Sequence, residues 1–555
     1  MRGLDPLAYP RCLMPLDRPL DAVHRTVDAW MTPRRAVTAS VASFSLVSLI
    51  AATPGSPYHP VLPGDSDGPL GWFARLLWLN RLPHGVLIAL GFVAMLAAGI
   101  SFLLVLFAAE RGIISVRTVV TLTIAYCAVI LVLPLLLSRD VFSYTYYGRI
   151  VTRYGGNPYV DPPSNFPGAD IAKWVWPGWR DTPSVYGPVF VWIAAAITGM
   201  IHSLTTTLFA FRAVAIGATL GSVWFVYMTM QVIRPSKTAY AMAFIGLNPV
   251  VLFHTAGGGH VDALVMLAIA AGIYLAATDR TLPATAVLTL GALVKVSAAV
   301  PLLLLVVYVV ARAEPGRRLR AFASHVGLAA GIGVFAAIPF MQSTNPTLGM
   351  LQIVQHASWI APPELLERIF EAGGGLIAGP AGGRIGIVVA RAAMYISLLV
   401  GVILVARQVA RKAAGEPIAY LAGSWGWALL LMMLFSPTLF PWYFCWVLPV
   451  AWALPKVPRR TLEIAFLALC TSQLTTESFQ ITGWIKVDLP IGHPLLIILL
   501  VWFLRDLYLR LRHDVPLDAD IDVLALSRAV HDREPLVLPE AAEPAEAADV
   551  SDYQA

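Results

Sequence analysis

Apolar runs of about 20 residues recur along most of this chain, and they constrain its fold more than any other feature. A helix of that length spans the ~30 Å hydrocarbon core of a bilayer. The composition agrees, because hydrophobic residues make up 58% of the 555 residues, charged residues only 13%, and the mean hydropathy is +0.71. A soluble domain carries roughly twice that share of charge. We therefore predict an all-α protein that crosses a membrane many times.

The individual runs predict about 13–14 transmembrane helices, interrupted by two long polar inserts at 138–184 and 342–385. Residues 1–35 are mixed and basic, with no evident cleavable signal peptide, and are predicted to be a cytoplasmic segment. Residues 36–512 are predicted to form one transmembrane module, and the acidic, Ala/Pro-rich residues 513–555 a disordered cytoplasmic tail. The predicted spans lie at 36–53, 84–107, 117–137, 208–233, 238–254, 261–277, 281–294, 297–311, 322–341, 386–406, 417–434, 439–454, 460–475 and 491–510.

Lysine and arginine in the short loops predict orientation, since cytoplasmic loops carry the excess of these residues. On this rule the insert 138–184 faces outward, provided that the apolar stretch 185–203 lies in the outer leaflet without crossing. In the alternative topology, Leu282 to Val310 form one long span and put Arg234 and Lys237 outside. The basic clusters expected in the cytoplasm are Arg34–Arg35, Arg111 with Arg117, Arg234 with Lys237, Arg312 to Arg320, Arg407 to Lys412, Lys456 to Arg460, and Arg505 with Arg510 and Arg512.

With this topology, most of the unusual polar and aromatic residues gather on the outer face. Ionisable groups near membrane depth are costly and usually mark a substrate path or site. Here carboxylates that could take a proton accompany cations that could hold an anion and aromatic faces that could stack on a sugar. A glycosyl-phosphate donor needs this mixture, because its phosphate requires Lys or Arg and the acceptor hydroxyl requires a base. The set comprises Arg139, Asp140, Arg149, Asn157, Asp161, Asp181, Tyr186, His254, His260, Asp262, Lys295, Gln352, Gln355, His356, Trp359, Trp442 and Tyr443.

Each of these residues also has an ordinary structural interpretation. Asp140 beside Arg139 is compatible with an interfacial ion pair, and Lys295 with snorkelling from a helix end. The stretch from Gly155 to Pro158 is typical of a turn, and Trp442 is typical of an aromatic belt at the membrane surface. The functional hypothesis therefore rests on the convergence of the whole set on one face.

Several other kinds of site are disfavoured. His254 and His260 are six residues apart, which is not the spacing of a zinc-binding helix, and no HExxH motif is present. No P-loop or strand-associated GxGxxG occurs, which argues against nucleotide-driven chemistry. The net charge of +6 is modest and does not indicate a nucleic-acid partner. The four cysteines are interpreted as small buried hydrophobic residues.

The order of several motifs resembles a known superfamily. An acid just after a span is followed by GR-x-V-x5-NPY, then TPSxYGP, then NP with a GGGHxD loop, a lysine in an apolar run, and PWY. This order, over about 117–455, resembles the GT-C superfamily of membrane glycosyltransferases that use polyprenyl-phosphate sugars. Within it, the chain looks most like the actinobacterial α-1,6-mannosyltransferases of lipomannan and lipoarabinomannan synthesis.

The resemblance implies roles for the matching positions. Asp140 stands where the family has its catalytic acid, as general base on the acceptor hydroxyl. The implied reaction is direct displacement from a β-linked polyprenyl-phosphate mannose with inversion. Two departures are evident: Asp140 follows the third predicted span rather than the first, and Val261 stands where an Asn is often found.

The remaining candidates divide between donor and acceptor. The resemblance implies a lipid-linked sugar donor, a glycolipid or glycan acceptor, and an active site outside the cell membrane with both termini inside. No cofactor or metal ligand is firmly implied, and a need for a divalent cation stays open. Candidates for the donor phosphate and sugar are Arg149, Lys295, His260, Asp262, His254, Tyr186 and His356; candidates for the acceptor and its loop are Asn157, Tyr159, Asp181, Trp442 and Tyr443.

Two alternatives remain open at this point. One is a lipid or solute transporter, although transporters place charges near the midplane and show internal repeats, and no convincing repeat is present. The other is an enzyme of the same fold that uses another sugar, such as arabinose or glucose, or a protein acceptor.

Overall fold

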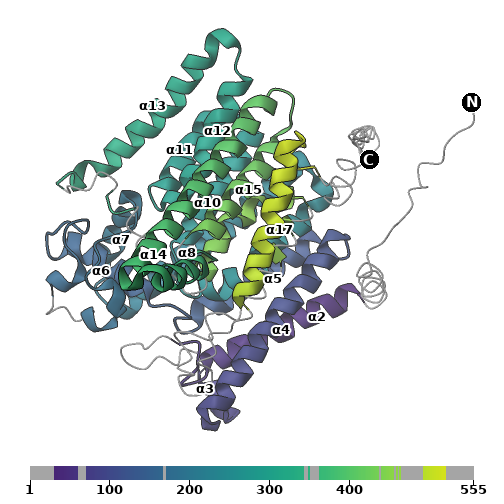
Figure 1. Ribbon diagram of the computed structural model, residues 1–555. Helices are drawn as coiled ribbons and strands as arrows, with labels where there is room; N and C mark the ends of the chain where they lie inside the picture. The colour runs from purple at the N-terminus through teal and green to yellow at the C-terminus, as the bar shows by residue number, and fades with distance from the viewer. Residues whose placement is uncertain are drawn as a thin grey trace, which may run out of the picture.

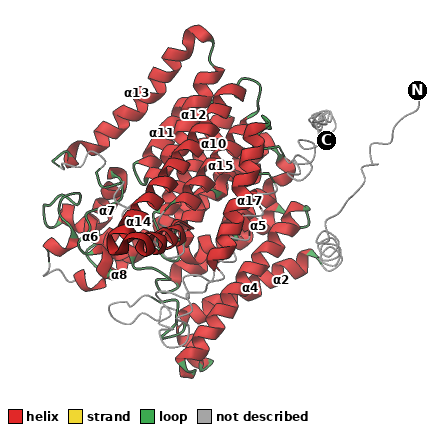
Figure 2. Ribbon diagram, in the orientation of Figure 1, coloured by secondary structure: helices red, strands yellow, loops and turns green. Residues whose placement is uncertain are grey.

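All regular structure that the computed structural model describes is helical (Figures 1 and 2). The described residues are 31–59, 71–166, 171–342, 348–350, 362–436, 439–455, 458–459, 462–463 and 492–519. A chain in lipid must satisfy its backbone polar groups internally, and helices do so within one segment. The prediction of an all-α polytopic membrane protein is therefore confirmed.

Most predicted spans correspond to a helix. Six described helices are long and apolar enough to cross a membrane, and the bent pair Pro235–Gly246 and Val250–Ala256 makes a seventh. Five shorter apolar helices accompany them, so the total of 13–14 crossings stays a prediction, and most of the predicted span 460–475 lies outside the described residues. The main helices of the bundle, long and short, are α2 (Pro33–Ala52), α4 (His84–Glu110), α5 (Val116–Val132), α8 (Leu204–Ile233), α10 (Asp262–Ala277), α11 (Thr281–Ala292), α12 (Ala299–Arg312), α13 (Arg318–Ala337), α14 (Pro362–Lys412), α15 (Ile418–Phe435) and α17 (Gly492–Arg512).

The first polar insert contains regular structure. Within 138–184 the chain forms α6 (Asp140–Thr152), which packs against α7 (Pro188–Met200) at the left of the bundle in Figure 1. The two backbones approach closely, since a Cβ added to Gly148 would lie 2.4 Å from the Ala194 carbonyl oxygen. With 13 residues, α7 is about 20 Å long and shorter than a hydrocarbon core. Its predicted place in the outer leaflet stays a prediction.

The second insert is also partly helical, because α14 is a helical hairpin that begins at Pro362 rather than at 386. Its arms meet at Ala378 and Gly379, whose backbone angles are not helical. A Cβ on Gly386 would lie 2.1 Å from the Phe370 carbonyl oxygen, so the arms touch backbone to backbone. Arg391 clamps them with two hydrogen bonds of 2.9 Å to Glu367. The glycines of this segment, part of which was predicted to be a polar insert, allow two helices to pack closely.

The C-terminal boundary also differs from the prediction. Residues 513–519, assigned to the disordered tail, pack against α14 and α15. Val515 and Leu517 are buried, Leu517 accepts a 2.8 Å hydrogen bond from Trp427 Nε1, and Val515 accepts one of the same length from Gln408 Nε2. Val515 and Leu517 thus anchor this stretch, whose other residues are half-buried or exposed. The rest of the tail lies outside the described residues.

Candidate active site

Asp140 is the first residue of α6 and lies at one edge of a buried cluster. Its backbone N–H donates to Ser138 Oγ at 3.1 Å, which fixes the start of the helix. Its carboxylate oxygen Oδ2 lies 3.5 Å from His260 Nδ1. The Asp140 side chain is 21% exposed whereas that of His260 is fully buried. Asp140 is therefore the member of this pair that a substrate can reach.

His260 lies in the loop between the π-helix Val250–Ala256 and α10. Gly259 has a φ of +69°, which a residue without a Cβ adopts at no steric cost. The imidazole stacks on Trp442 at 3.7 Å between ring centroids, and its Nδ1 lies 3.4 Å from the Tyr144 hydroxyl. Burial, and then the nearby Lys295 charge, hold the pKa of His260 well below its usual range. The imidazole is thus neutral, and its contact with Asp140 is not an ion pair.

Lys295 and Asp262 form a buried ion pair behind this contact. Lys295 Nζ donates to Asp262 Oδ1 at 2.8 Å, and Trp446 Nε1 donates to the same oxygen at 2.9 Å. The ammonium also lies over the Tyr443 ring, 3.9 Å from its centroid. Asp262 Oδ2 is buried without a hydrogen-bond partner. A cation in this setting can hold an anion that displaces or joins the carboxylate.

A small cavity adjoins Lys295. Its volume is about 40 Å³, and it opens between the break that separates α11 from α12 and the aromatic residues after α15. The Lys295 ammonium thus contacts Asp262 and also borders this cavity, so a ligand group in the cavity can approach the ammonium. The cavity is lined by Val185, Tyr186, Lys295, Val296, Ser297, Met350, Met432, Ser436, Tyr443 and Trp446.

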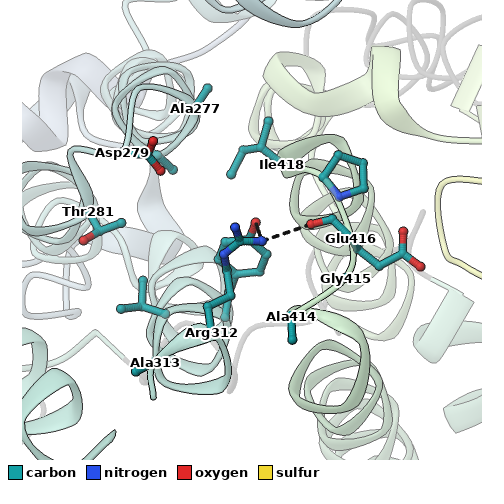
Figure 3. A pocket seen from close by; sticks show the side chains of 13 residues that line it. Ala277, Asp279, Thr281, Arg312, Ala313, Ala414, Gly415, Glu416 and Ile418 are labelled. Atoms are coloured by element: carbon teal, nitrogen blue, oxygen red, sulfur yellow. Dashed lines mark hydrogen bonds between the residues drawn. The ribbon is translucent and has the colours of Figure 1, made fainter. Parts of the chain in front are cut away.

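A larger cavity of about 660 Å³ shares no residue with this cluster. It lies where the C-terminal end of α12 meets the turn between α14 and α15 (Figure 3). Arg312 is its only lining arginine, and Nη1 of that residue already donates to the carbonyls of Ala413 and Glu416 at 3.0 and 3.2 Å. The larger cavity is therefore not the better candidate for the active site, because the predicted site residues gather around the smaller one.

The structure brings together Asp140, His260, Asp262, Lys295, Tyr186, Trp442 and Tyr443 from distant parts of the chain. His254 is fully buried on the π-helix and acts electrostatically on His260. The seven residues brought together come from five of the motifs that the sequence analysis identified.

Other predicted residues lie apart from this cluster or have structural contacts. Arg149 is buried nine residues along α6 from Asp140, which places it about 13 Å away along the axis and on the opposite face. Asn157 closes a turn, because its Oδ1 accepts the Tyr159 N–H at 3.1 Å. The Tyr159 hydroxyl donates to the Tyr186 carbonyl at 2.9 Å. Asp181 is exposed, and His356 lies outside the described residues.

Three contributors were absent from the predicted site list. Trp446 donates to Asp262 Oδ1, Tyr144 touches His260, and Cys445 Sγ donates to the Asp262 carbonyl at 3.2 Å. The first could have been found from its spacing, because Trp446 follows Trp442 by four residues in the same aromatic run. Within the described residues, no three His, Cys, Asp or Glu side chains are grouped as metal ligands.

The sequence is similar to a family of known enzymes. Residues 41–312 match the family model for the N-terminal domain of α-(1→6)-mannopyranosyltransferases. α-(1→6)-Mannopyranosyltransferase A of Mycobacterium tuberculosis is 27% identical over 413 residues, covering 71% of this chain and 76% of that protein. The A enzyme of Corynebacterium glutamicum is 29% identical over 168 residues, or 30% of this chain and 34% of that protein. No solved structure matches the chain.

The chain is a membrane glycosyltransferase similar to the actinobacterial α-(1→6)-mannopyranosyltransferases. The resemblance inferred from the order of motifs is thereby confirmed. The part of the glycosyltransferase that matches the family model contains Asp140, His260 and Lys295 and ends before Trp442. The buried cluster therefore joins residues inside and outside the matched domain.

Proposed function

We propose that this glycosyltransferase moves mannose from a polyprenyl-phosphate donor to a growing α-1,6-mannan glycolipid on the outer face of the membrane. The proposal rests on one observation: a partly exposed carboxylate, Asp140, lies in the same cluster as a cation, Lys295, that borders a cavity. Asp140 touches His260, and the pKa of His260 is lowered partly by Lys295, so the two functional groups belong to one cluster. The names of the mannosyltransferase relatives support mannose as the sugar.

Asp140 is proposed as the general base. It is the carboxylate of the cluster that is accessible, whereas Asp262 is buried and bound to Lys295. A base within hydrogen-bond reach of the acceptor hydroxyl makes that oxygen a better nucleophile as it attacks the anomeric carbon. The carbon–phosphate oxygen bond breaks on the opposite side, so the β-linked mannose becomes an α-mannoside and the proton stays on Asp140. No covalent intermediate with the protein is needed.

Lys295 is proposed to bind the phosphate. Phosphate leaves readily when a cation stabilises its developing charge. Lys295 lines the cavity, and Tyr443 lies beneath its ammonium, so an entering phosphate would meet the cation from the open side. The polyprenyl chain would remain in lipid. Adding EDTA to the transfer assay measures whether a divalent cation is also required.

The proposed orientation rests on charge. Basic residues in short loops, such as Arg317 and Arg318 before α13, favour the cytoplasm. Both termini are then cytoplasmic and the site faces outward. A cysteine at Ser236 should react with an impermeant reagent only after the membrane is opened; labelling of intact cells would invert this topology.

Asp140→Asn tests the proposed base. The amide keeps the size of the side chain and removes its basicity, so transfer from polyprenyl-phosphate mannose should fall at least 100-fold, within the usual ~10²–10⁴ range for general-base catalysis. The matched control is Asp181→Asn, which changes an exposed carboxylate of the same insert and should keep wild-type activity. Transfer per inserted molecule is compared in membranes. An Asp140→Asn rate near wild type would exclude Asp140 as the base.

A further inference from the structure

The segment that connects α5 to Asp140 is buried although it is not helical. Residues 133–138 are all buried, and Leu137 has a φ of 60°. A leucine rarely adopts that conformation, which costs about 1–3 kcal/mol and persists only when the surrounding structure holds it. Something must therefore fix this linker, and through it the position of the Asp140 carboxylate.

Arg212 of α8 holds the start of the linker. Its Nη1 donates to the Leu133 carbonyl and lies 3.3 Å from the Ile130 oxygen, so the guanidinium caps the C-terminal end of α5. Arg212 is only 2% exposed. Its Nε is buried without a hydrogen-bond partner. An arginine buried in an apolar span is costly and is rarely retained without a function.

Two backbone hydrogen bonds hold the rest of the linker. The Leu136 N–H donates to the Gly257 carbonyl at 3.3 Å, and the Leu137 N–H donates to the Tyr58 carbonyl at 2.8 Å. Gly257 begins the turn that carries His260. Tyr58 belongs to the loop after α2, and its hydroxyl donates to the Gly91 carbonyl of α4 at 2.6 Å. The linker is therefore tied to the His260 turn on one side and to the N-terminal helices on the other.

The backbone of Arg212 also touches the His260 turn. A Cβ added to Gly259 would lie 3.5 Å from the Arg212 nitrogen, so the turn rests on α8 at this level. The preceding residue, Phe211, packs against Tyr144 at 5.8 Å between ring centroids. One turn of α8 thus contacts the α5 end, the His260 turn and the tyrosine beside His260.

From these contacts we infer that Arg212 is a positioning residue that sets the distance between Asp140 and His260 by fixing the end of α5. The inference rests on the proposed role of Asp140 as base. A misplacement of about 1 Å can cost about 10²-fold in rate, and the Arg212 side chain does not contact Asp140, His260 or Lys295 in any described hydrogen bond or ion pair. Its replacement should therefore lower kcat and leave donor binding nearly unchanged.

The test measures kcat, donor KM and the pH profile of kcat for Arg212→Gln and Arg212→Lys, with polyprenyl-phosphate mannose and a short α-1,6-mannoside as probes. We expect Arg212→Gln to lower kcat about 10- to 100-fold with donor KM within about twofold, and to change the pH profile because the surroundings of Asp140 change. Arg212→Lys can still donate to a carbonyl and should retain part of the rate.

Arg510 provides a matched control. It is also a buried arginine, on α17, which packs against α14, and its Nη1 donates to the carbonyls of Pro516 and Ala519 at 3.0 and 2.7 Å. Arg510→Gln should lower the amount of folded protein without lowering kcat per folded molecule. The inference is overturned if Arg212→Gln keeps wild-type kcat, or if Arg510→Gln loses kcat equally.

Two further variants cover other outcomes. If Arg212→Gln does not fold, Arg212→Lys and Tyr58→Phe decide the question. Tyr58→Phe keeps the backbone carbonyl that accepts the Leu137 N–H but removes the hydroxyl hydrogen bond that ties Tyr58 to Gly91, so it should loosen this anchor of the linker and lower kcat at unchanged KM. Wild-type kcat in both would overturn the inference. Asp140→Asn is measured in the same series: activity in that variant would refute the proposed base, whereas the Arg212 variants report separately on whether the linker sets the rate.

Discussion

Replacing Lys295 by methionine should cost both stability and donor use. Lys295 Nζ lies 2.8 Å from Asp262 Oδ1, and the two side chains are 10% and 1% exposed. Methionine keeps much of the aliphatic volume, so the change removes charge more than packing. Asp262 would keep the hydrogen bond from Trp446, but its second oxygen already has no partner. Removing one member of a buried pair typically costs about 3–5 kcal/mol of unfolding free energy.

The double variant Lys295→Met with Asp262→Asn separates the two consequences. Removing both charges leaves no uncompensated ion, so the double variant should regain most of the lost stability. It should not regain sugar transfer, because the cation for the leaving phosphate is still missing. Thermal unfolding in detergent measures stability, and transfer per folded molecule at varied donor concentration measures function. An equally unstable double variant would refute the stability argument, and wild-type transfer by Lys295→Met would refute the phosphate role.

Two further predictions concern packing around the site. Gly148→Ala should separate α6 from α7 and lower both stability and transfer, because the new Cβ would lie 2.4 Å from a backbone oxygen. Gly199→Ala is the control at the same interface: its Cβ would meet only an ordinary 3.5 Å contact, so the variant should be tolerated. Ending the chain after Arg512 should lower the thermal midpoint, because the side-chain donors of Gln408, Trp427 and Arg510 lose backbone acceptors at about 1–3 kcal/mol each. Ending it after Ala519 keeps these acceptors and should leave the midpoint unchanged.

The sequence predicted the helical class, and its candidate residues Asp140, His260 and Lys295 lie in one cluster of contacts. Span lengths and apolar composition suffice for helices in lipid, because no other open structure satisfies the backbone there. Asp140, His260 and Lys295 were identified because each is an ionisable residue at the edge of an apolar run, where its cost indicates a function.

The contacts among those residues could not be predicted. Trp446 was overlooked because an indole in an aromatic run resembles membrane-surface packing until a carboxylate is placed beside it. The first arm of the α14 hairpin fell in a predicted polar insert, since the backbone contact that its glycines permit appears only when the two arms are placed together. Arg212 was not singled out, because a lone charge within a predicted span gives no partner until α5 is placed next to α8.

Because the segment before His260 contains the π-helix Val250–Ala256, the position of His260 depends on the number of residues in that segment as well as on their identity. A π-helix fits one more residue into a turn than an α-helix does. Deleting one residue while the remaining turns keep their hydrogen-bond pattern would rotate the downstream chain by roughly 100°. His260 would then leave both Trp442 and Asp140, although every site residue would still be present. Related chains are therefore best compared by the spacing between Asn248 and His260, and an alignment gap within that spacing predicts a differently built site.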